Sequence, residues 1–109
     1  MDWRLRRDGG RLVGAPSGRV DEDSWRDFSD HLTAAVLEAA QGSMPLVIDL
    51  SGLEFMTSKG LRALTLAKKA AGGAVTIHLA APNMAMRRIL SISRYDMLFP
   101  VVDSVDQVG

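Results

Sequence analysis

The chain has 109 residues, of which 47% are hydrophobic and 24% are charged, and these values are ordinary for a soluble globular protein. Thirteen basic residues balance thirteen acidic ones, so the net charge gives no reason to expect a nucleic acid or an anionic membrane as a partner. The absence of cysteine excludes disulfides and cysteine-bound metals. We find no signal peptide and no long apolar run, and we therefore expect one cytoplasmic domain over residues 1–109.

The N-terminal residues predict two short strands. Trp3 and Leu5 alternate with arginines, a pattern typical of a half-buried strand. Asp-Gly-Gly at residues 8–10 indicates a turn, and a strand resumes at residues 12–13. Pro, Ser and Gly at residues 16–18 are expected to end the regular structure there.

A helix and a buried strand are predicted next. Apolar residues recur at steps of three and four over residues 25–39, Asp23 or Ser24 can cap the helix, and Gly42 ends it. The largely apolar run at residues 46–50 is typical of a central strand that is covered on both faces.

The second half of the chain continues the alternation. A helix is expected to begin near Ser58 and end before Gly72, followed by a strand in residues 74–81 and a helix from about Pro82. Residues 97–102 predict a last strand, and residues 103–109 can start a terminal helix that is cut short. Strands that alternate with helices predict an α/β fold with a mixed, mainly parallel sheet and helices packed on it.

The helix that begins near Ser58 has two contrasting faces. At about 100° per residue, small residues and one leucine share the face expected to pack on the sheet: Gly60, Ala63, Leu64, Ala67, Ala70 and Ala71. The opposite face carries Ser58, Arg62, Thr65, Leu66 and Lys69. Leu66 is the one apolar residue there, and we interpret it as a partner anchor beside Ser58 and Arg62.

The third predicted helix also separates core and outer residues. Met86, Ile89 and Leu90 form its expected core stripe, while Met84, Arg87 and Arg88 face outward. Met84 either extends an apolar contact patch or is an isolated exposed side chain.

Two hydroxyls and a lysine occupy the start of the second helix, at Thr57, Ser58 and Lys59. The pattern alone favours a simple N-cap. A kinase acceptor is the alternative, because a phosphate adds a charge of about −1.5 to −2 that the free N–H groups of a helix N-terminus stabilise. Lys59 is then either a solvated cation or a group that screens the phosphate or recognises an acidic partner.

The chain has no recognisable catalytic constellation. Asp21 and Asp49 show no metal-binding spacing, and His31 and His78 without cysteine make a zinc site improbable. No phosphate-binding loop, dinucleotide fingerprint or nucleophile elbow occurs. We therefore expect no enzymatic activity, no metal and no cofactor.

The segment VIDLSGLEFMTSKGLRAL, residues 47–64, resembles the central segment of STAS domains, the family of sulfate transporters and anti-sigma-factor antagonists. GRVDEDSWRDF and RRILSISRYDMLFPVVDSVDQ are similar to other parts of the same family, so the resemblance covers nearly the whole chain. It implies the STAS fold and a regulatory protein-binding module.

The resemblance also implies a switch. In antagonist members, the serine that aligns with Ser58 is phosphorylated by a kinase that is itself the anti-sigma factor, so Ser58 is the expected acceptor and Thr57 the second candidate. Thr57 stands where many members have Asp, and Lys59 where Ser or Ala is usual. The expected partner-binding residues are Lys59, Arg62, Leu66 and Asp21.

Two other interpretations remain open. A STAS subunit of a transport complex, for instance for lipids, or of a stress-signalling complex would use the loop only as a contact surface, and Lys59 favours this interpretation. A nucleotide-binding or weakly hydrolytic domain is the third, against which the missing phosphate-binding loop counts.

Overall fold

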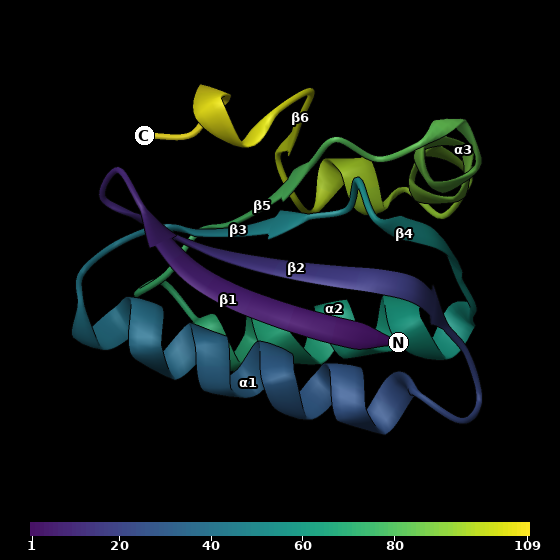
Figure 1. Ribbon diagram of the computed structural model, residues 1–109, viewed down its shortest axis with the longest axis horizontal. Helices are drawn as coiled ribbons and strands as arrows, with labels where there is room; N and C mark the ends of the chain where they lie inside the picture. The colour runs from purple at the N-terminus through teal and green to yellow at the C-terminus, as the bar shows by residue number, and fades with distance from the viewer.

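The computed structural model describes all residues, 1–109, and its strands form one mixed six-stranded sheet (Figure 1). The main path of the sheet runs in the order β1 (Asp2–Asp8), β2 (Arg11–Val20), β3 (Leu46–Asp49), β5 (Ile77–Ala80) and β6 (Val101–Val102). β4 (Leu53–Met56) pairs with the far end of β2. Only β1 and β2 are antiparallel, which confirms the predicted mixed, mainly parallel α/β fold.

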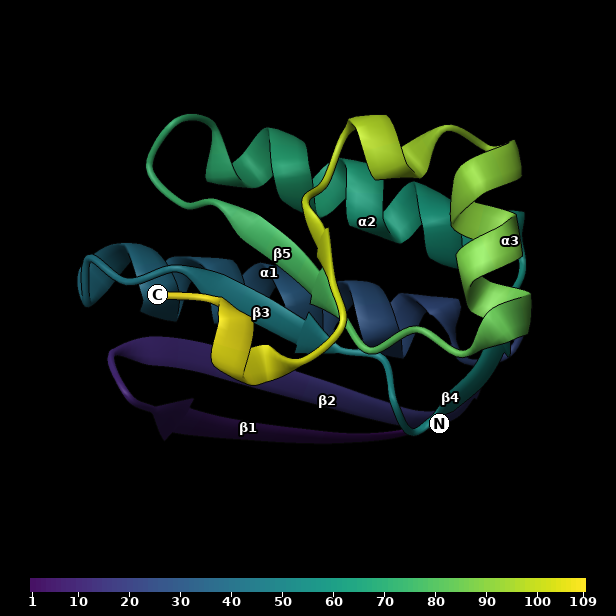
Figure 2. The same cartoon turned by 90° about the horizontal axis from the view of Figure 1, so that it is seen from above.

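The helices lie mostly on one side of this sheet. α1 (Trp25–Gln41) and α2 (Ser58–Ala71) run side by side under one face, and α3 (Met84–Ile92) stands at one end of the molecule beside β4 (Figures 1 and 2). Two short 3₁₀ turns, η1 (Tyr95–Met97) and η2 (Val105–Gln107), follow α3. The main core therefore lies between the sheet and the α1–α2 layer, because the apolar stripes of both helices face the same strands.

The predicted packing face of α2 is confirmed with one exception. Its buried residues are Gly60, Ala63, Leu64, Ala67 and Ala71, whereas Ala70 is exposed. The core stripe of α3 is also confirmed, since Met86 and Leu90 are buried and Met84 faces outward.

β2 is longer than the sequence indicated. It continues through Pro16 to Val20, with a positive φ of 88° at Gly18 and a register shift directly after it. β2 pairs with β3 through residues 12–14 and with β4 through residues 18–20. Pro16 lies between these two pairings, where β2 has a partner only in β1, so this proline does not interrupt the strand.

Two strands differ from the prediction. β4 was not predicted, because a strand of four residues directly after the turn at Ser51-Gly52 is too short to show an alternating pattern. The strand predicted over residues 97–102 is only the two-residue β6, since Met97 belongs to η1. The terminal helix, expected to be cut short, is the single turn η2.

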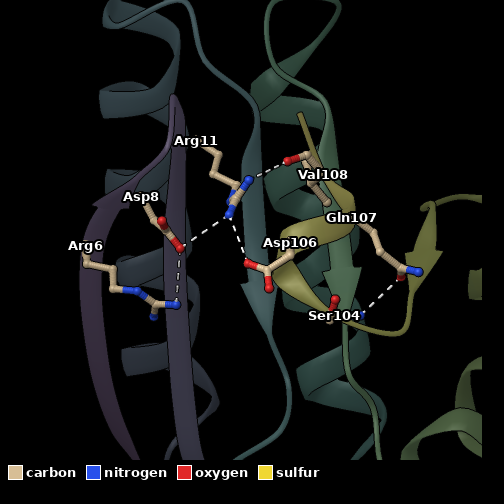
Figure 3. A network of polar contacts seen from close by, with 7 residues as sticks. All are labelled: Arg6, Asp8, Arg11, Ser104, Asp106, Gln107 and Val108. Carbon is tan, nitrogen blue, oxygen red and sulfur yellow. Dashed lines mark hydrogen bonds and ion pairs between the residues drawn. The ribbon is translucent and has the colours of Figure 1, made fainter.

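The C-terminal segment covers part of the other face of the sheet. Val108 completes a small second core there with Val13, Val47 and Ala80. Arg11 holds this segment, because its guanidinium donates to the Val108 carbonyl oxygen at 2.8 Å and to Asp106 at 3.3 Å (Figure 3). The side chain of Arg11 is only 13% exposed, so these are partly buried charge-assisted contacts.

Gly60 is required by the approach of α2 to the sheet. An ideal Cβ at Gly60 would lie 2.9 Å from both Met56 Cβ and Val20 Cγ1. We expect Gly60→Ala to lower the free energy of unfolding by about 1–3 kcal/mol, because overpacking outweighs the better helix propensity of alanine. Urea unfolding followed by circular dichroism measures this change. The matched control is Gly73→Ala, where no atom lies within 4 Å, and an equal loss in both variants would contradict the explanation.

Candidate functional site

The site predicted at the start of α2 is positioned by the pairing of β2 with β4. Val20 and Met56 are paired in parallel register, and the Thr57 N–H donates to the Val20 carbonyl oxygen at 2.9 Å. Both strands therefore end at the same place. The loop that leads into α1 and the first turn of α2 consequently lie next to each other.

The two hydroxyls of this loop have different surroundings. Thr57 is the N-cap residue, with φ −80° and ψ 177°, but its side chain accepts no capping hydrogen bond and its Oγ1 is buried without a partner. Ser58 is the first residue of α2 and is exposed. Of the two hydroxyls, that of Ser58 is the one within reach of a second protein.

The N-terminus of α2 has no negatively charged or capping side chain. No side chain caps it, and no acidic residue lies in its first turn. The first N–H groups of a helix have no partner within the helix, and the aligned peptide dipoles add a partial positive charge there. The start of α2 is therefore a favourable environment for an added negative charge on Ser58.

Lys59 connects the starts of α1 and α2. Its Nζ lies 2.8 Å from Glu22 Oε2 and 5.5 Å from the centre of the Trp25 ring. The side chain is 47% exposed, so this ion pair contributes little to stability. Neither Glu22 nor Trp25 was expected from the sequence, because only the strand register brings the two loops together.

Asp21 organises the loop before α1. Its Oδ1 accepts hydrogen bonds from the backbone N–H of Asp23 at 3.0 Å and of Ser24 at 3.2 Å. The backbone hydrogen bond from Asp23, followed by the hydrogen bonds from Ser24, lowers the pKa of the Asp21 carboxyl. Ser24 is the N-cap residue of α1, but its side chain forms no capping hydrogen bond, so the side-chain cap expected at Asp23 or Ser24 is not formed.

The remaining predicted site residues follow α2 away from Ser58. Arg62 is exposed and forms no ion pair, and the Leu66 side chain is 42% exposed. Ser58, Arg62 and Leu66 are spaced by four residues and so lie along one ridge of the helix. We call Ser58, Lys59, Arg62 and Leu66 the α2 surface; Asp21 lies in the neighbouring loop.

The other titratable residues have local roles. Asp49 accepts the Ser51 N–H at 3.0 Å, and His31 stacks on Trp3 with ring centres 5.3 Å apart. No three His, Asp or Glu side chains are placed to hold a metal ion together. None of the helices has the length and apolar character needed to cross a bilayer.

Comparison with known proteins identifies the family. Residues 3–102 match the family model described as "Mlab, STAS domain", whereas no curated protein matches the sequence. An anti-sigma factor antagonist from Mycobacterium paratuberculosis is 27% identical with a TM-score of 0.85, over 97% of this chain and 88% of that one. A STAS domain protein from Planctomyces limnophilus is 20% identical with a TM-score of 0.85, over 98% and 94%.

A third solved structure is more distant. The Bacillus cell fate determinant SpoIIAA in its phosphorylated form is 16% identical with a TM-score of 0.64, over 92% of this chain and 90% of that one. The chain thus has the fold of anti-sigma factor antagonists, which supports a regulatory role. With a family model that matches nearly its whole length, the chain belongs to the STAS domain family.

Proposed function

We propose that the protein is an anti-sigma factor antagonist that is switched at Ser58. In its unmodified form it binds a kinase-type anti-sigma factor through the α2 surface, and phosphorylation of Ser58 releases it. The observation that carries the proposal is the exposed Ser58 hydroxyl at an uncapped helix N-terminus, beside a Thr57 hydroxyl that is inaccessible. The ATP and Mg²⁺ belong to the kinase, and the protein itself acts by binding.

Two solved relatives support this proposal. SpoIIAA is described as an anti-sigma factor antagonist in an unphosphorylated form and as a cell fate determinant in a phosphorylated form. The Mycobacterium paratuberculosis antagonist has the same fold at 27% identity. A phosphorylated form is therefore compatible with this fold.

The effect of the phosphate follows from where it would be placed. Within the isolated domain, the free N–H groups of the α2 N-terminus stabilise a dianion on Ser58. In a complex, the same dianion is buried against the partner, and an unpaired buried charge is costly. One modification thus leaves the fold unchanged and breaks the complex.

A second function is favoured by Lys59. Lys59 follows Ser58 in the chain, pairs with Glu22, and stands where antagonists usually have a small residue; the matching family model is described as "Mlab, STAS domain". In this alternative the protein is a subunit of a transport or stress-signalling complex, and the α2 surface is a permanent contact.

Mass spectrometry distinguishes the two functions. Incubation with ATP, Mg²⁺ and a kinase-type anti-sigma factor encoded by the same genome should add one phosphate, located on Ser58. We expect Ser58→Ala to abolish the modification and Thr57→Val to retain it, because the Thr57 oxygen is buried. Phosphate on Thr57 contradicts the assignment, and tight binding without any phosphate favours the permanent-contact alternative.

Leu66 provides a test of the binding surface. We expect Leu66→Ala to weaken binding to the anti-sigma factor by about 1 kcal/mol or more, while the free energy of unfolding stays within about 0.5 kcal/mol of wild type. Isothermal titration calorimetry and urea unfolding measure the two quantities. Leu37 on α1, which is 61% exposed, is the matched control, and Leu37→Ala should bind like wild type. Unchanged binding of Leu66→Ala would place the partner on another face.

Lys59 is tested by a cycle of four proteins: wild type and Lys59→Ala, each with and without phosphate on Ser58. We expect the phosphate to reduce affinity more in Lys59→Ala, because the variant loses the cation next to Ser58 in the chain and leaves the Glu22 carboxylate unpaired. The loss of binding free energy caused by the phosphate should differ between the two backgrounds by more than the few tenths of a kcal/mol that a screened surface charge contributes. Equal penalties would show that Lys59 has no part in the switch.

A further inference from the structure

The formal charges of the chain cancel in total but are unevenly distributed along the sequence. Residues 21–41, which contain α1, hold six acidic residues and one basic residue. Residues 58–97, from α2 through η1, hold seven basic residues and one acidic residue. The neutral total therefore conceals a basic segment, and the net charge alone does not describe what that segment can bind.

α3 combines this basic character with unusual apolar exposure. Met84 is 80% exposed and Ile92 is 77% exposed, although the opposite side of the same helix is packed into the core. The helix stands at the end of the molecule (Figure 2), and the two exposed side chains lie at its two ends. Isolated exposed apolar residues need no explanation, but these two line a common hollow.

The hollow is formed by five side chains of α3 that we call the α3 outer surface: Met84, Arg87, Arg88, Ser91 and Ile92. This hollow is shallow and open to solvent, because all five side chains lie on the outer side of one helix. Met84, Arg88 and Ile92 are four residues apart, so they form one ridge, and the two apolar ends are about 12 Å apart along the axis. Along this ridge the surface thus presents the apolar Met84, the basic Arg88 and the apolar Ile92 in that order.

The two arginines of this surface differ in their surroundings. Arg87 Nη2 lies 3.2 Å from Asp103 Oδ1, so its charge is already paired. Arg88 forms no ion pair, and α3 contains no acidic residue. A binding partner that covers Met84 and Ile92 also removes water from Arg88, and a desolvated charge requires a counter-charge in the same contact.

We propose that the α3 outer surface binds an acidic segment of a protein partner, in which one carboxylate lies between two apolar side chains about two helical turns apart. The carboxylate pairs with Arg88, and the apolar side chains cover Met84 and Ile92. The flexible thioether of Met84 adapts to apolar partners of different shape. This proposal does not rest on phosphorylation of Ser58, because it concerns a different helix.

A lipid surface fits this pattern less well. Helices that lie in a membrane interface place a continuous apolar face in the acyl region and their basic residues at its margins. Here Arg88 lies in the middle of the apolar ridge, and no aromatic residue occurs in α3. A second copy of the chain would have to present the acidic residues of its α1 to Arg88, and the self-association measurement described below tests this case.

A synthetic stapled helical peptide tests the proposal, with leucine, glutamate and leucine at successive four-residue intervals in an alanine–glutamine background. Titration into the ¹⁵N-labelled full chain should give saturable NMR shift changes centred on residues 84–92. We expect Arg88→Glu to weaken binding about tenfold or more, and Met84→Ser or Ile92→Ser about fivefold. The matched controls, Arg4→Glu on β1 and Leu37→Ser on α1, change exposed residues elsewhere and should stay within about twofold.

Reversal of the charges on both partners distinguishes specific recognition from nonspecific hydrophobic binding. A peptide with lysine in place of glutamate should bind wild type poorly. The same peptide should bind Arg88→Glu with an affinity equal to that of the acidic peptide for wild type. Absence of binding, shift changes elsewhere, or equal binding of both peptides overturns the proposal. Cosedimentation with phosphatidylglycerol vesicles that depends on Met84 and Ile92 overturns it in favour of a membrane. Self-association that Arg88→Glu abolishes overturns it in favour of a second copy.

Discussion

The parallel pairing of β4 with the last residues of β2 determines where the chain presents its candidate site. Because Val20 and Met56 end their strands in register, α1 and α2 start next to each other on the same side of the sheet. Gly60 then allows the first turn of α2 to approach both strand ends, where a larger residue would collide with Met56 and Val20. This close approach leaves the Thr57 hydroxyl oxygen buried while Ser58 stays exposed. The accessibility of the Ser58 hydroxyl therefore follows from the pairing of β2 with β4 and from the lack of a side chain at Gly60.

The parts of the structure that the sequence predicted are those with a local period. The buried face of α2 repeats every three to four residues, and all of its members but Ala70 are buried as expected. At about 100° per residue, Ala70 lies at the margin of this face, whereas Ala71 lies near its centre and is buried. The unpredicted parts depend on partners far along the chain. β4 is a strand because β2 lies beside it, and Pro16 is tolerated because the partners of β2 change on either side of it. The pair of Lys59 with Glu22 has the same origin.

The uneven distribution of charge along the chain is not visible in its composition. Residues 21–41 hold six acidic residues, whereas Arg62 on α2 and Arg88 on α3 have no ion-pair partner within the chain. Exposed unpaired cations of this kind favour the approach of an acidic surface, and they affect association rate more than affinity.

The charges around Ser58 explain why a phosphate there would change binding at an interface and leave the fold of the domain unchanged. Ser58 is exposed at a helix N-terminus without a cap, so the isolated domain accommodates a new negative charge without repacking its core. The one cation next to Ser58 in the chain, Lys59, is already paired with Glu22 at 2.8 Å. A phosphate on the exposed Ser58 would therefore meet the helix N-terminus on one side and any bound protein on the other. A partner surface that is apolar or acidic at this position is then repelled, while the fold that presents Ser58 is unchanged.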